Sequence, residues 1–514
     1  MPDINTNLQR LQDDSAEIES LVDDIVESIA DSGGVVSPTG GLRSFPTAIE
    51  SIPIQINAKL EPEVDLYDSI LSGGSPVPTT ASGVVRFFDY DGSIVATYTS
   101  RQFLALTSLP ANPTHEGLTS QGWNWSLSDA KEYVTDYGSL DIGQMYVTAD
   151  GSTRLHIRLG DGRLKPYLGL TGDSSGTTVS IDWGDGSAAE SVTLNTTTVY
   201  TSHEYTTSGE YTISISVTTG SITLIGDSTY NSNILRKSST PNANDDRVYQ
   251  NSLIGVEFGN NVSIGNNTFY NCFSLTSITI PDGITTIENN AFSGCRSLQS
   301  ITIPDTVTSI GTQAFYQCYS LQSITIPDSV TTIGSNAFYN CYSLTSITIP
   351  DTVTTIENNA FSGCCSLQSI TIPDTVTSIG NSAFYQCYSL TSINIPDGVT
   401  IIGNKAFQYC YSLTSITIPD TVTTIAEYTF QLCFSLTSIT IPDTVTSIGT
   451  YTFQNCHGLG SIKFERLSPP TVSSSSAFTN LPTDCKIYVP SGSLAAYTTA
   501  TNYPSSSTYT YIEY

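Results

Sequence analysis

A repeat of 23 residues fills positions 275–458 and constrains most of what this chain can fold into. Each copy opens with Leu, continues as Ser-Ile-Thr-Ile-Pro-Asp and Val-Thr-Ser-Ile with small variations, and ends on Phe and Cys. A 22-residue version precedes these copies at 253–274. Self-similarity at such a period predicts a solenoid in which each repeat forms one coil. The opening leucines are Leu275, Leu298, Leu321, Leu344, Leu367, Leu390, Leu413, Leu436 and, where the pattern dissolves, Leu459.

The copy at 298–320 shows how one coil is built. Ile301 and Ile303 alternate with Ser300 and Thr302, so the isoleucines point inward and the hydroxyls outward along a short strand. Pro304 lacks the N–H that would continue the strand. No coil can bury its apolar residues alone, so neighbours must stack around a shared core. Parallel pairing sets the spacing at about 4.8 Å, and nine coils make a rod of about 40 Å.

These motifs resemble the BspA-like subclass of leucine-rich repeats, which occurs in bacterial surface proteins, phage proteins and some protist surface proteins. The resemblance covers 253–514 and includes Cys485-Lys-Ile-Tyr-Val-Pro followed by Ser-Gly-Ser-Leu-Ala-Ala-Tyr, similar to that family's C-terminal cap. It implies a leucine-rich-repeat solenoid of nine coils at 253–458 and a cap at 459–514. Solenoids need caps to shield the last coil.

The coils are also alike at a longer period. The units at 275–297 and 344–366 share Glu-Asn-Asn-Ala-Phe-Ser-Gly-Cys, and those at 298–320 and 367–389 share Ala-Phe-Tyr-Gln-Cys-Tyr-Ser. Both pairs lie 69 residues, or three coils, apart, which indicates duplication of a three-coil block. An array that changes length without changing its fold suits a variable surface better than an active site.

Composition excludes several partners. The 514 residues carry 47 acidic and 18 basic side chains, a formal charge of −29, which argues against nucleic acid and anionic membranes as partners. No apolar run approaches the ~18 residues of a membrane span, so we expect no membrane insertion. The start, Met-Pro-Asp-Ile-Asn, has neither the basic nor the apolar region of a Sec signal peptide.

Nine of the eleven cysteines share one repeat position, from Cys272 to Cys456. Neighbours in register would lie within disulfide range, but their side chains would point inward in parallel. We therefore expect buried, reduced thiols that act as small hydrophobic groups. Cys365 and Cys485 fall outside this column. The pattern suits folding in a reducing cytoplasm.

The N-terminal segment carries a heptad pattern over residues 3–31 that predicts a coiled coil and an oligomerising or anchoring helix. The alternative is an amphipathic helix packed on its own domain. The whole module at 1–70 resembles the N-terminal module of structural proteins from phages and prophages of gut bacteria. Residues 71–83 form a linker. The apolar seam is Ile4, Leu8, Leu11, Ile18, Val22, Ile25 and Ile29.

Two domains and a connector lie between the linker and the repeats, so the predicted fold class is mixed and mainly β. Residues 84–150 predict a small α+β domain with a hairpin around Asp91-Gly92 and a helix at 127–134. The domain at 151–225 resembles a PKD-type β-sandwich, on the residues Val179–Ser187, His203–Tyr205 and Tyr211–Val217. Such domains are spacers or adhesive modules. Residues 226–252 are the connector.

No motif predicts catalysis, a cofactor or a metal site. Gly172–Gly176 matches G-x-S-x-G, but a nucleophile elbow needs a strand before it and a helix after it, and here a Ser/Gly-rich loop leads into a strand. The four histidines share no metal-ligand spacing. Asp89-x-Asp91-Gly92 contains only the start of a calcium loop, and the surrounding alternation explains it as a turn.

Two columns of outward residues are candidates for binding, an aromatic column and the Ser/Thr face of the strands. Aromatic side chains follow the repeat cysteines and suit sugar rings or a protein partner; the alternative is that they seal the outer turn. For the Ser/Thr face, the alternative is a solvated surface. The aspartates from Asp282 to Asp443 predict turn chemistry; the alternative is a ladder of carboxylates that collects cations. The aromatic column is Phe273, Tyr319, Tyr342, Tyr388, Tyr411 and Phe434, interrupted by Arg296, Cys365 and His457.

The first functional hypothesis is a phage virion protein, either a tail fibre or a capsid or tail decoration, made in the host cytoplasm. Its N-terminus would bind other virion proteins, and its repeats would bind a glycan or protein on the host surface, in a homo-oligomer. The alternative is a BspA-like adhesin on a bacterial cell surface. Neither hypothesis involves an enzyme.

Overall fold

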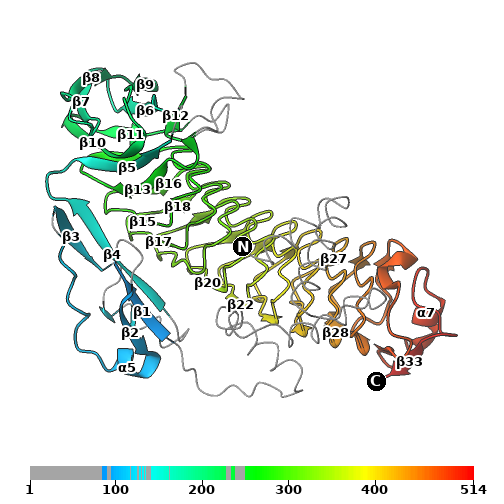
Figure 1. The fold of residues 1–514 in the computed structure, drawn as a ribbon. Coiled ribbons are helices and arrows are strands. Elements are labelled where there is room, and N and C mark those ends of the chain that lie inside the picture. The colour runs from blue at the N-terminus through cyan, green and yellow to red at the C-terminus, as the bar shows by residue number, and fades with distance from the viewer. Residues whose placement is uncertain are drawn as a thin grey trace, which may run out of the picture. The chain divides into compact units, whose positions relative to one another are not determined.

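The computed structural model describes most of the chain from residue 84 onward, and Figure 1 shows its course. This part is mainly β: two sheet-built domains followed by a solenoid. The predicted coiled-coil seam, the anchoring module at 1–70 and the linker at 71–83 lie outside the described residues and stay predictions. The described residues are 84–89, 94–115, 117–123, 127–128, 130–131, 134, 140–160, 163–226, 233–237 and 249–514.

The first domain is a four-stranded sheet in the order β2-β1-β4-β3. Strands β1 and β2 are antiparallel, with Val84 opposite Thr99, as the predicted hairpin requires; its Asp91-Gly92 turn lies outside the described residues. Thr99 caps the following helix by accepting a hydrogen bond from the backbone of Gln102. The described residues within 127–134 are helical, as predicted. The elements are β1 (Val84–Phe88), β2 (Ile94–Thr99), α5 (Ser100–Leu104), β3 (Leu118–Trp123) and β4 (Leu140–Thr148).

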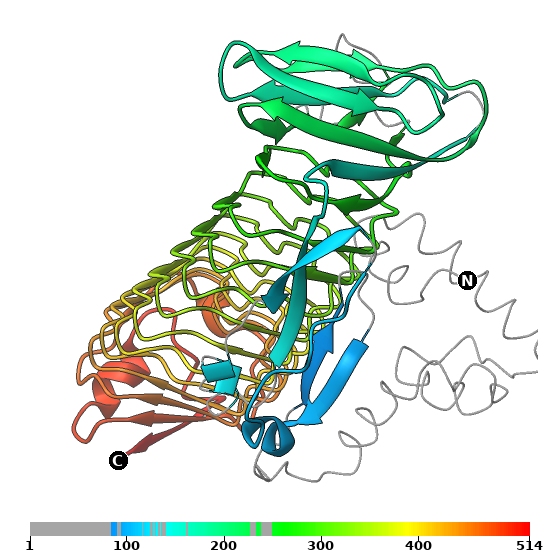
Figure 2. The same cartoon turned by 90° about the vertical axis from the view of Figure 1, so that its left-hand side faces the viewer.

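The second domain has two sheets that enclose a common apolar core, as the sandwich prediction requires (Figure 2). One sheet has the order β13-β5-β10-β7-β8; the other has the order β12-β6-β11-β14, with β9 also paired to β6. The strands are β5 (Thr153–Leu159), β6 (Tyr167–Gly172), β7 (Thr177–Asp182), β8 (Glu190–Leu194), β9 (Val199–Ser202), β10 (Gly209–Thr219), β11 (Ile222–Leu224), β12 (Leu235–Arg236), β13 (Leu253–Glu257) and β14 (Val262–Ile264).

The G-x-S-x-G match and the segment after strand β7 both form turns in this domain. Gly172–Gly176 joins strand β6 to strand β7, so the G-x-S-x-G match lies in a strand-turn-strand and not at a nucleophile elbow. After β7, Trp183 is buried and stacks on His203, whose Nε2 lies 2.7 Å from Oδ2 of Asp185. Hydrogen bonds from Ser187 and His203 lower the pKa of Asp185, so its carboxylate stays charged.

The sandwich is joined to the solenoid by shared strands. The segment that opens the first coil supplies β13, which pairs antiparallel with β5, and β14, which pairs parallel with β11. The same segment leads to Phe269, whose ring stacks on Phe292 of the next coil. One stretch of chain therefore completes both sheets of the sandwich and begins the stack of coils.

The coils stack in register through two columns of short parallel strands, as the repeat predicts (Figure 1). Ser277, Ile278 and Thr279 lie opposite Ser300, Ile301 and Thr302 of the next coil. The Ser-Ile-Thr strands are β15 (Ser277–Thr279), β17 (Ser300–Thr302), β20 (Ser346–Thr348), β22 (Ser369–Thr371), β24 (Ser392–Ile393), β26 (Ser415–Ile416) and β28 (Ser438–Ile441). The second column comprises β16 (Thr286–Ile287), β18 (Ser309–Ile310), β19 (Thr332–Ile333), β21 (Thr355–Ile356), β23 (Ser378–Ile379), β25 (Ile401–Ile402), β27 (Thr424–Ile425), β29 (Ser447–Ile448) and β31 (Thr471–Val472).

Two buried ladders hold the coils together. Phenylalanine rings stack from Phe269 to Phe478 at centroid distances of 5.1–5.8 Å. Each thiol from Cys295 to Cys456 donates to the carbonyl of the phenylalanine 26 residues earlier, at 3.0–3.3 Å. The cysteines therefore combine the apolar role expected of them with a hydrogen bond between coils.

Hydroxyl groups add a third link between coils at the turn after most of the Ser-Ile-Thr strands, while Gly283 and Gly398 stand at this position in two coils. Thr306 Oγ1 donates to the carbonyl of Ile284 at 2.8 Å, and Thr375 Oγ1 donates to that of Val353 at 2.7 Å. These residues directly follow the aspartates of the Asp column, which fits the turn role predicted for it. Within the described residues, no group of three or more His, Cys, Asp or Glu side chains is arranged to hold a metal ion.

The last coil is covered by added strands and aromatic side chains. Strand β30 extends the Ser-Ile-Thr column, followed by β32 and β33, all in parallel. Tyr497 is fully buried against Phe464. This arrangement covers the last coil by continuing its parallel strands, and the cap at 459–514 stays a prediction. Its elements are β30 (Ser461–Phe464), η4 (Ser475–Phe478), β32 (Lys486–Val489), α7 (Leu494–Thr499) and β33 (Thr510–Glu513).

Removing one ring from the phenylalanine ladder should destabilise the array. Phe361 is fully buried and stacks on Phe338 and Phe384 at 5.6 Å. We expect Phe361→Ala to lower the free energy of unfolding by about 3–5 kcal/mol, measured from the urea midpoint by circular dichroism. The control Thr371→Ala, at an exposed strand position, should cost less than about 0.5 kcal/mol. Equal effects of the two changes would contradict the ladder's role.

The cysteines should differ sharply in reactivity. All eleven are free thiols, and only Cys365 is not buried. Burial raises the pKa of the Cys456 thiol to about 12 and that of Cys485 to about 11, so neither forms the reactive thiolate at neutral pH. We expect iodoacetamide to label Cys365 of the native protein, and all cysteines only after denaturation, as read by mass spectrometry. Rapid native labelling of the Cys272–Cys456 column would refute this packing.

Candidate binding surfaces of the repeat array

The aromatic column lies on the outer turn of the coils, because each member follows a buried cysteine. The rings of Tyr319 and Tyr342 stack at 4.8 Å, as do those of Tyr388 and Tyr411. Tyr411 also stacks on Phe434 at 4.8 Å, and the ring of His457 follows at 5.4 Å. The register of the coils therefore brings together the residues that the sequence predicted as one column.

The rings in this column cover one another's faces, which changes what they can bind. Their planes are within 15° of parallel, so the stacked members present ring edges and polar atoms outward. Most members are half-buried, while Phe434 is 37% exposed. A sugar that packs on a ring face has little access where the rings stack on each other. The column covers the outer turn and presents a row of ring edges to the outside.

A second set of tyrosines, which the sequence analysis missed, lies on the same turns. Tyr316 stacks on Tyr339 at 4.9 Å, and Tyr409 contacts Tyr411 of the aromatic column edge to face. Further along, Tyr428 stacks on Tyr451 at 4.9 Å. The sequence carried a signal for Tyr316 and Tyr339, which follow Phe in Ala-Phe-Tyr copies, whereas Tyr428 and Tyr451 stand two residues before Phe. These tyrosines widen the aromatic column into an aromatic face.

Arg296 does not break the aromatic column. Its guanidinium carbon lies 4.7 Å from the ring centroid of Phe273 in the coil before and 5.3 Å from that of Tyr319 in the coil after. These are cation–π distances. The Nε atom of Arg296 is buried and makes no hydrogen bond. The guanidinium of Arg296 is therefore held mainly by its contacts with the rings of Phe273 and Tyr319.

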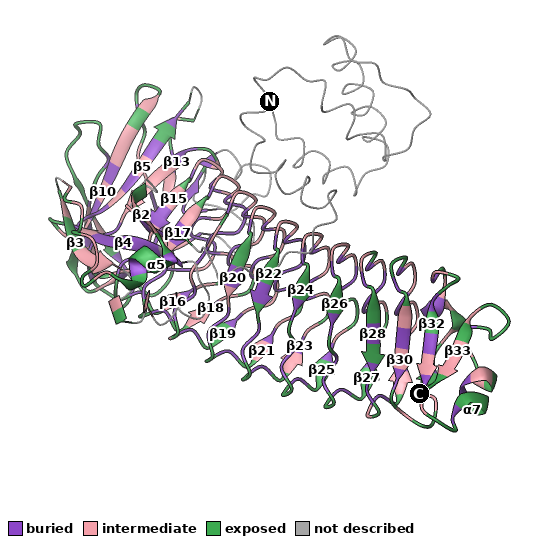
Figure 3. Cartoon of the chain, turned by 90° about the horizontal axis from the view of Figure 1, so that it is seen from below, coloured by how far each residue is buried: buried purple, intermediate pink, exposed green. Residues whose placement is uncertain are grey.

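The Ser/Thr face of the strands differs along the array. Ser277, Ser300 and Ser323, with the threonines two residues after each, are half-buried. From Ser369 to Thr440 the equivalent residues are exposed, as the burial colours of Figure 3 show. The sequence predicted one uniform solvated face. The difference arises because the first domain packs against the first coils.

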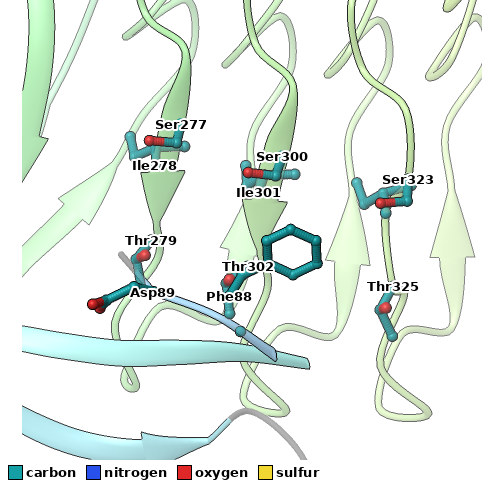
Figure 4. Close-up of a pocket in the computed structure, with 12 residues that line it drawn as sticks. Phe88, Asp89, Ser277, Ile278, Thr279, Ser300, Ile301, Thr302, Ser323 and Thr325 are labelled. Carbon is teal, nitrogen blue, oxygen red and sulfur yellow. The ribbon is translucent and has the colours of Figure 1, made fainter. Parts of the chain in front are cut away.

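A small pocket marks this contact (Figure 4). Its walls are the Ser-Ile-Thr segments of three successive coils on one side and Phe88, Asp89 and Gly143 on the other. The side-chain oxygen of Gln121 also accepts a hydrogen bond from the backbone of Asp282 at 3.3 Å. Gly143 lies in β4 where a Cβ atom would overlap the side chain of Thr302. The pocket is thus the seam between a domain and the array.

The comparisons with known proteins bear on the repeats. Residues 262–391 and 377–498 match the model of the BspA type leucine rich repeat region. Over these residues the solenoid is similar to that repeat region. That match is to a structural repeat and not to an enzyme family. It does not extend to the PKD-type or phage-module resemblances, which stay predictions. No match was found among curated proteins.

Several solved structures are similar to parts of the chain. A leucine-rich repeat protein from Bacteroides ovatus is 24% identical, with 57% of this chain and 96% of that one covered and a TM-score of 0.32. A leucine rich cell surface protein from Faecalibacterium prausnitzii is 27% identical, with 54% and 93% covered and a TM-score of 0.27. The pneumococcal vaccine antigen PcpA is 18% identical, with 49% and 78% covered and a TM-score of 0.32.

Adding a side chain at Gly143 should weaken the packing of the first domain on the repeat array. We expect Gly143→Ala to weaken the contact by about 1–3 kcal/mol, because the new methyl group overlaps Thr302. Amide hydrogen exchange of peptides covering 298–327 should become roughly tenfold faster, read by mass spectrometry. Gly160→Ala is the matched control, since nothing lies within 4 Å of its added Cβ. Unchanged exchange in Gly143→Ala would show that the seam does not protect these strands.

Proposed function

We propose that this protein is an adhesin-type recognition protein displayed on a bacterial cell surface, and that the aromatic face of its BspA-type array contacts a macromolecular partner. The observation that carries the proposal is the aromatic face itself. The core already holds a complete ladder of buried phenylalanines, so the rings on the outer turns are not needed to fill it. Partly exposed tyrosine and phenylalanine side chains in a row are typical of interface anchors.

The architecture supports this role. A solenoid spreads its binding surface over many coils, so a partner can meet several equivalent rings at once. The three-coil duplication lets such a surface change length while its coils keep the same packing. The BspA-type match agrees with the expectation, drawn from the family resemblance, of a bacterial surface protein.

The virion hypothesis depends on residues 1–70, which lie outside the described residues. Nothing in the matched repeats favours a virion over a cell surface, and the BspA-type match favours the adhesin. None of the described helices has the length and apolar character needed to cross a membrane. Attachment to a surface, by the N-terminal module or otherwise, is part of the proposal.

A single exposed ring should matter more than a neighbouring hydroxyl. We expect Phe434→Ser to weaken attachment of the full chain to mucin-coated wells and to intact bacterial cells by about tenfold or more, because interface aromatics contribute about 2 kcal/mol or more. Thr417→Ala, on the exposed strand face of the same coil, is the control and should bind like the unmodified protein.

Attachment of the unmodified chain to none of these surfaces would count against the adhesin role. Equal binding by Phe434→Ser and Thr417→Ala would show that the partner does not contact the aromatic face at Phe434. Circular dichroism of both variants checks that the fold is intact.

A further inference from the structure

The sheet that continues the Ser-Ile-Thr column ends at strand β33. Its strand order is β28-β30-β32-β33, and Figure 3 shows β33 outermost in that row. Just after β33, Tyr514 donates its backbone N–H to the carbonyl of Val489, and its own carbonyl accepts from the N–H of Ser491. Both backbone groups of Tyr514 therefore face β32.

Alternation along β33 fixes which backbone groups face away from β32. In a parallel pair, one residue directs its N–H and its C=O to the neighbouring strand, and the next residue directs both to the opposite side. Because Tyr514 faces β32, Ile512 does as well, and Tyr511 and Glu513 face outward. Within the described residues, no hydrogen bond reaches the backbone N–H or C=O of Tyr511 or Glu513. The array thus ends in two unpaired donors and two unpaired acceptors.

This edge lacks the features that block strand pairing in natural proteins, which are Lys, Pro and bulges. Strand β33 reads Thr-Tyr-Ile-Glu and pairs with β32 without a register shift. Its one charged side chain turns back on its own chain, since Oε1 of Glu513 accepts from the N–H of Gly492 at 2.9 Å and of Leu494 at 3.2 Å. The outer side of β33 therefore fits another extended chain.

The two ends of the array differ in this respect. At the other end, β13 and β14 of the first coil already pair with β5 and β11 of the sandwich. The first coil of another copy is therefore not available to fill the β33 edge. What remains on a second copy is the same β33 edge.

We propose that β33 is a self-association site, at which the edges of two copies pair antiparallel about a two-fold axis through Ile512. With Ile512 opposite its own copy, Tyr511 of each chain lies opposite Glu513 of the other. Each such pair exchanges two N–H···O=C hydrogen bonds, so all the unpaired groups of the edge are satisfied at once. The contact uses the same surface on both copies and therefore closes as a dimer.

The side chains allow this pairing. Ile512 lies beside Tyr488 on the outward face of the sheet and is half-buried, so the two copies of Ile512 would pack on each other at the axis. The two arrays would join end to end in one continuous sheet. This inference goes beyond the proposed function, and a partner of the aromatic face would meet two arrays in one particle.

Site-specific cross-linking of the full chain tests the register. Ile512 and its copy form a pair without mutual hydrogen bonds, with Cα atoms about 4.5 Å apart, which is within disulfide range. We expect Ile512→Cys to form a disulfide dimer under mild oxidation, seen by non-reducing electrophoresis and by mass spectrometry of the linked peptides. The matched control is Thr510→Cys, an exposed position on the same face whose copy would lie about 14 Å away. It should give at least about tenfold less dimer.

A second pair of variants tests the backbone hydrogen bonds. In the Ile512→Cys background, Glu513→Ala and Glu513→Pro both remove the carboxylate, but only proline also removes the outward N–H. We expect cross-linking to persist with Glu513→Ala and to fall at least about tenfold with Glu513→Pro, with circular dichroism confirming that both variants are folded.

Equal cross-linking of Ile512→Cys and Thr510→Cys, no cross-linking of Ile512→Cys, or no effect of Glu513→Pro would overturn the proposal. The readout is a bond between two copies and involves no host surface. The β33 site and the adhesin role can therefore fail separately.

Discussion

In-register stacking of the coils is the constraint on which the rest of the array depends. One coil of 23 residues has an apolar side that it cannot bury, so its folding is favourable only against a neighbour. The Phe269–Phe478 ladder and the thiol-to-carbonyl hydrogen bonds make that contact specific, because ring must meet ring and sulfur must meet oxygen. A slip of one residue would turn the inward isoleucines outward.

The same register creates the surfaces that face solvent. A residue placed at one outward position recurs a few ångströms away in the next coil, so a single choice in the repeat becomes a column. The ring centroids of Tyr319 and Tyr342 are 4.8 Å apart for this reason, because the spacing is set by the backbone register. Exceptions in a column are therefore informative. Arg296 and Cys365 occupy equivalent backbone turns in two coils. The coils therefore have the same shape there but present different side chains.

The two domains that precede the array are joined to it by contacts that do not repeat. Strands β13 and β14 belong to the first coil and also complete the sandwich, so the first coil is covered by β-sheet pairing instead of solvent. The first domain covers the strand face of the early coils, where Gly143 allows close approach to Thr302. The exposed strand face therefore begins only further along the array.

The sequence by itself determined the solenoid, the inward Ile and outward Ser/Thr of each strand, the aromatic column and the reduced cysteines. These follow from alternation along a strand and from a period repeated many times, so each copy adds to the same signal. Only the tertiary structure decided that the column's rings stack face to face, that Arg296 lies between two of them, and that the first domain packs on the early coils. Those outcomes depend on single pairs such as Gln121 with Asp282, far apart in the chain and occurring once, and no periodic pattern encodes them.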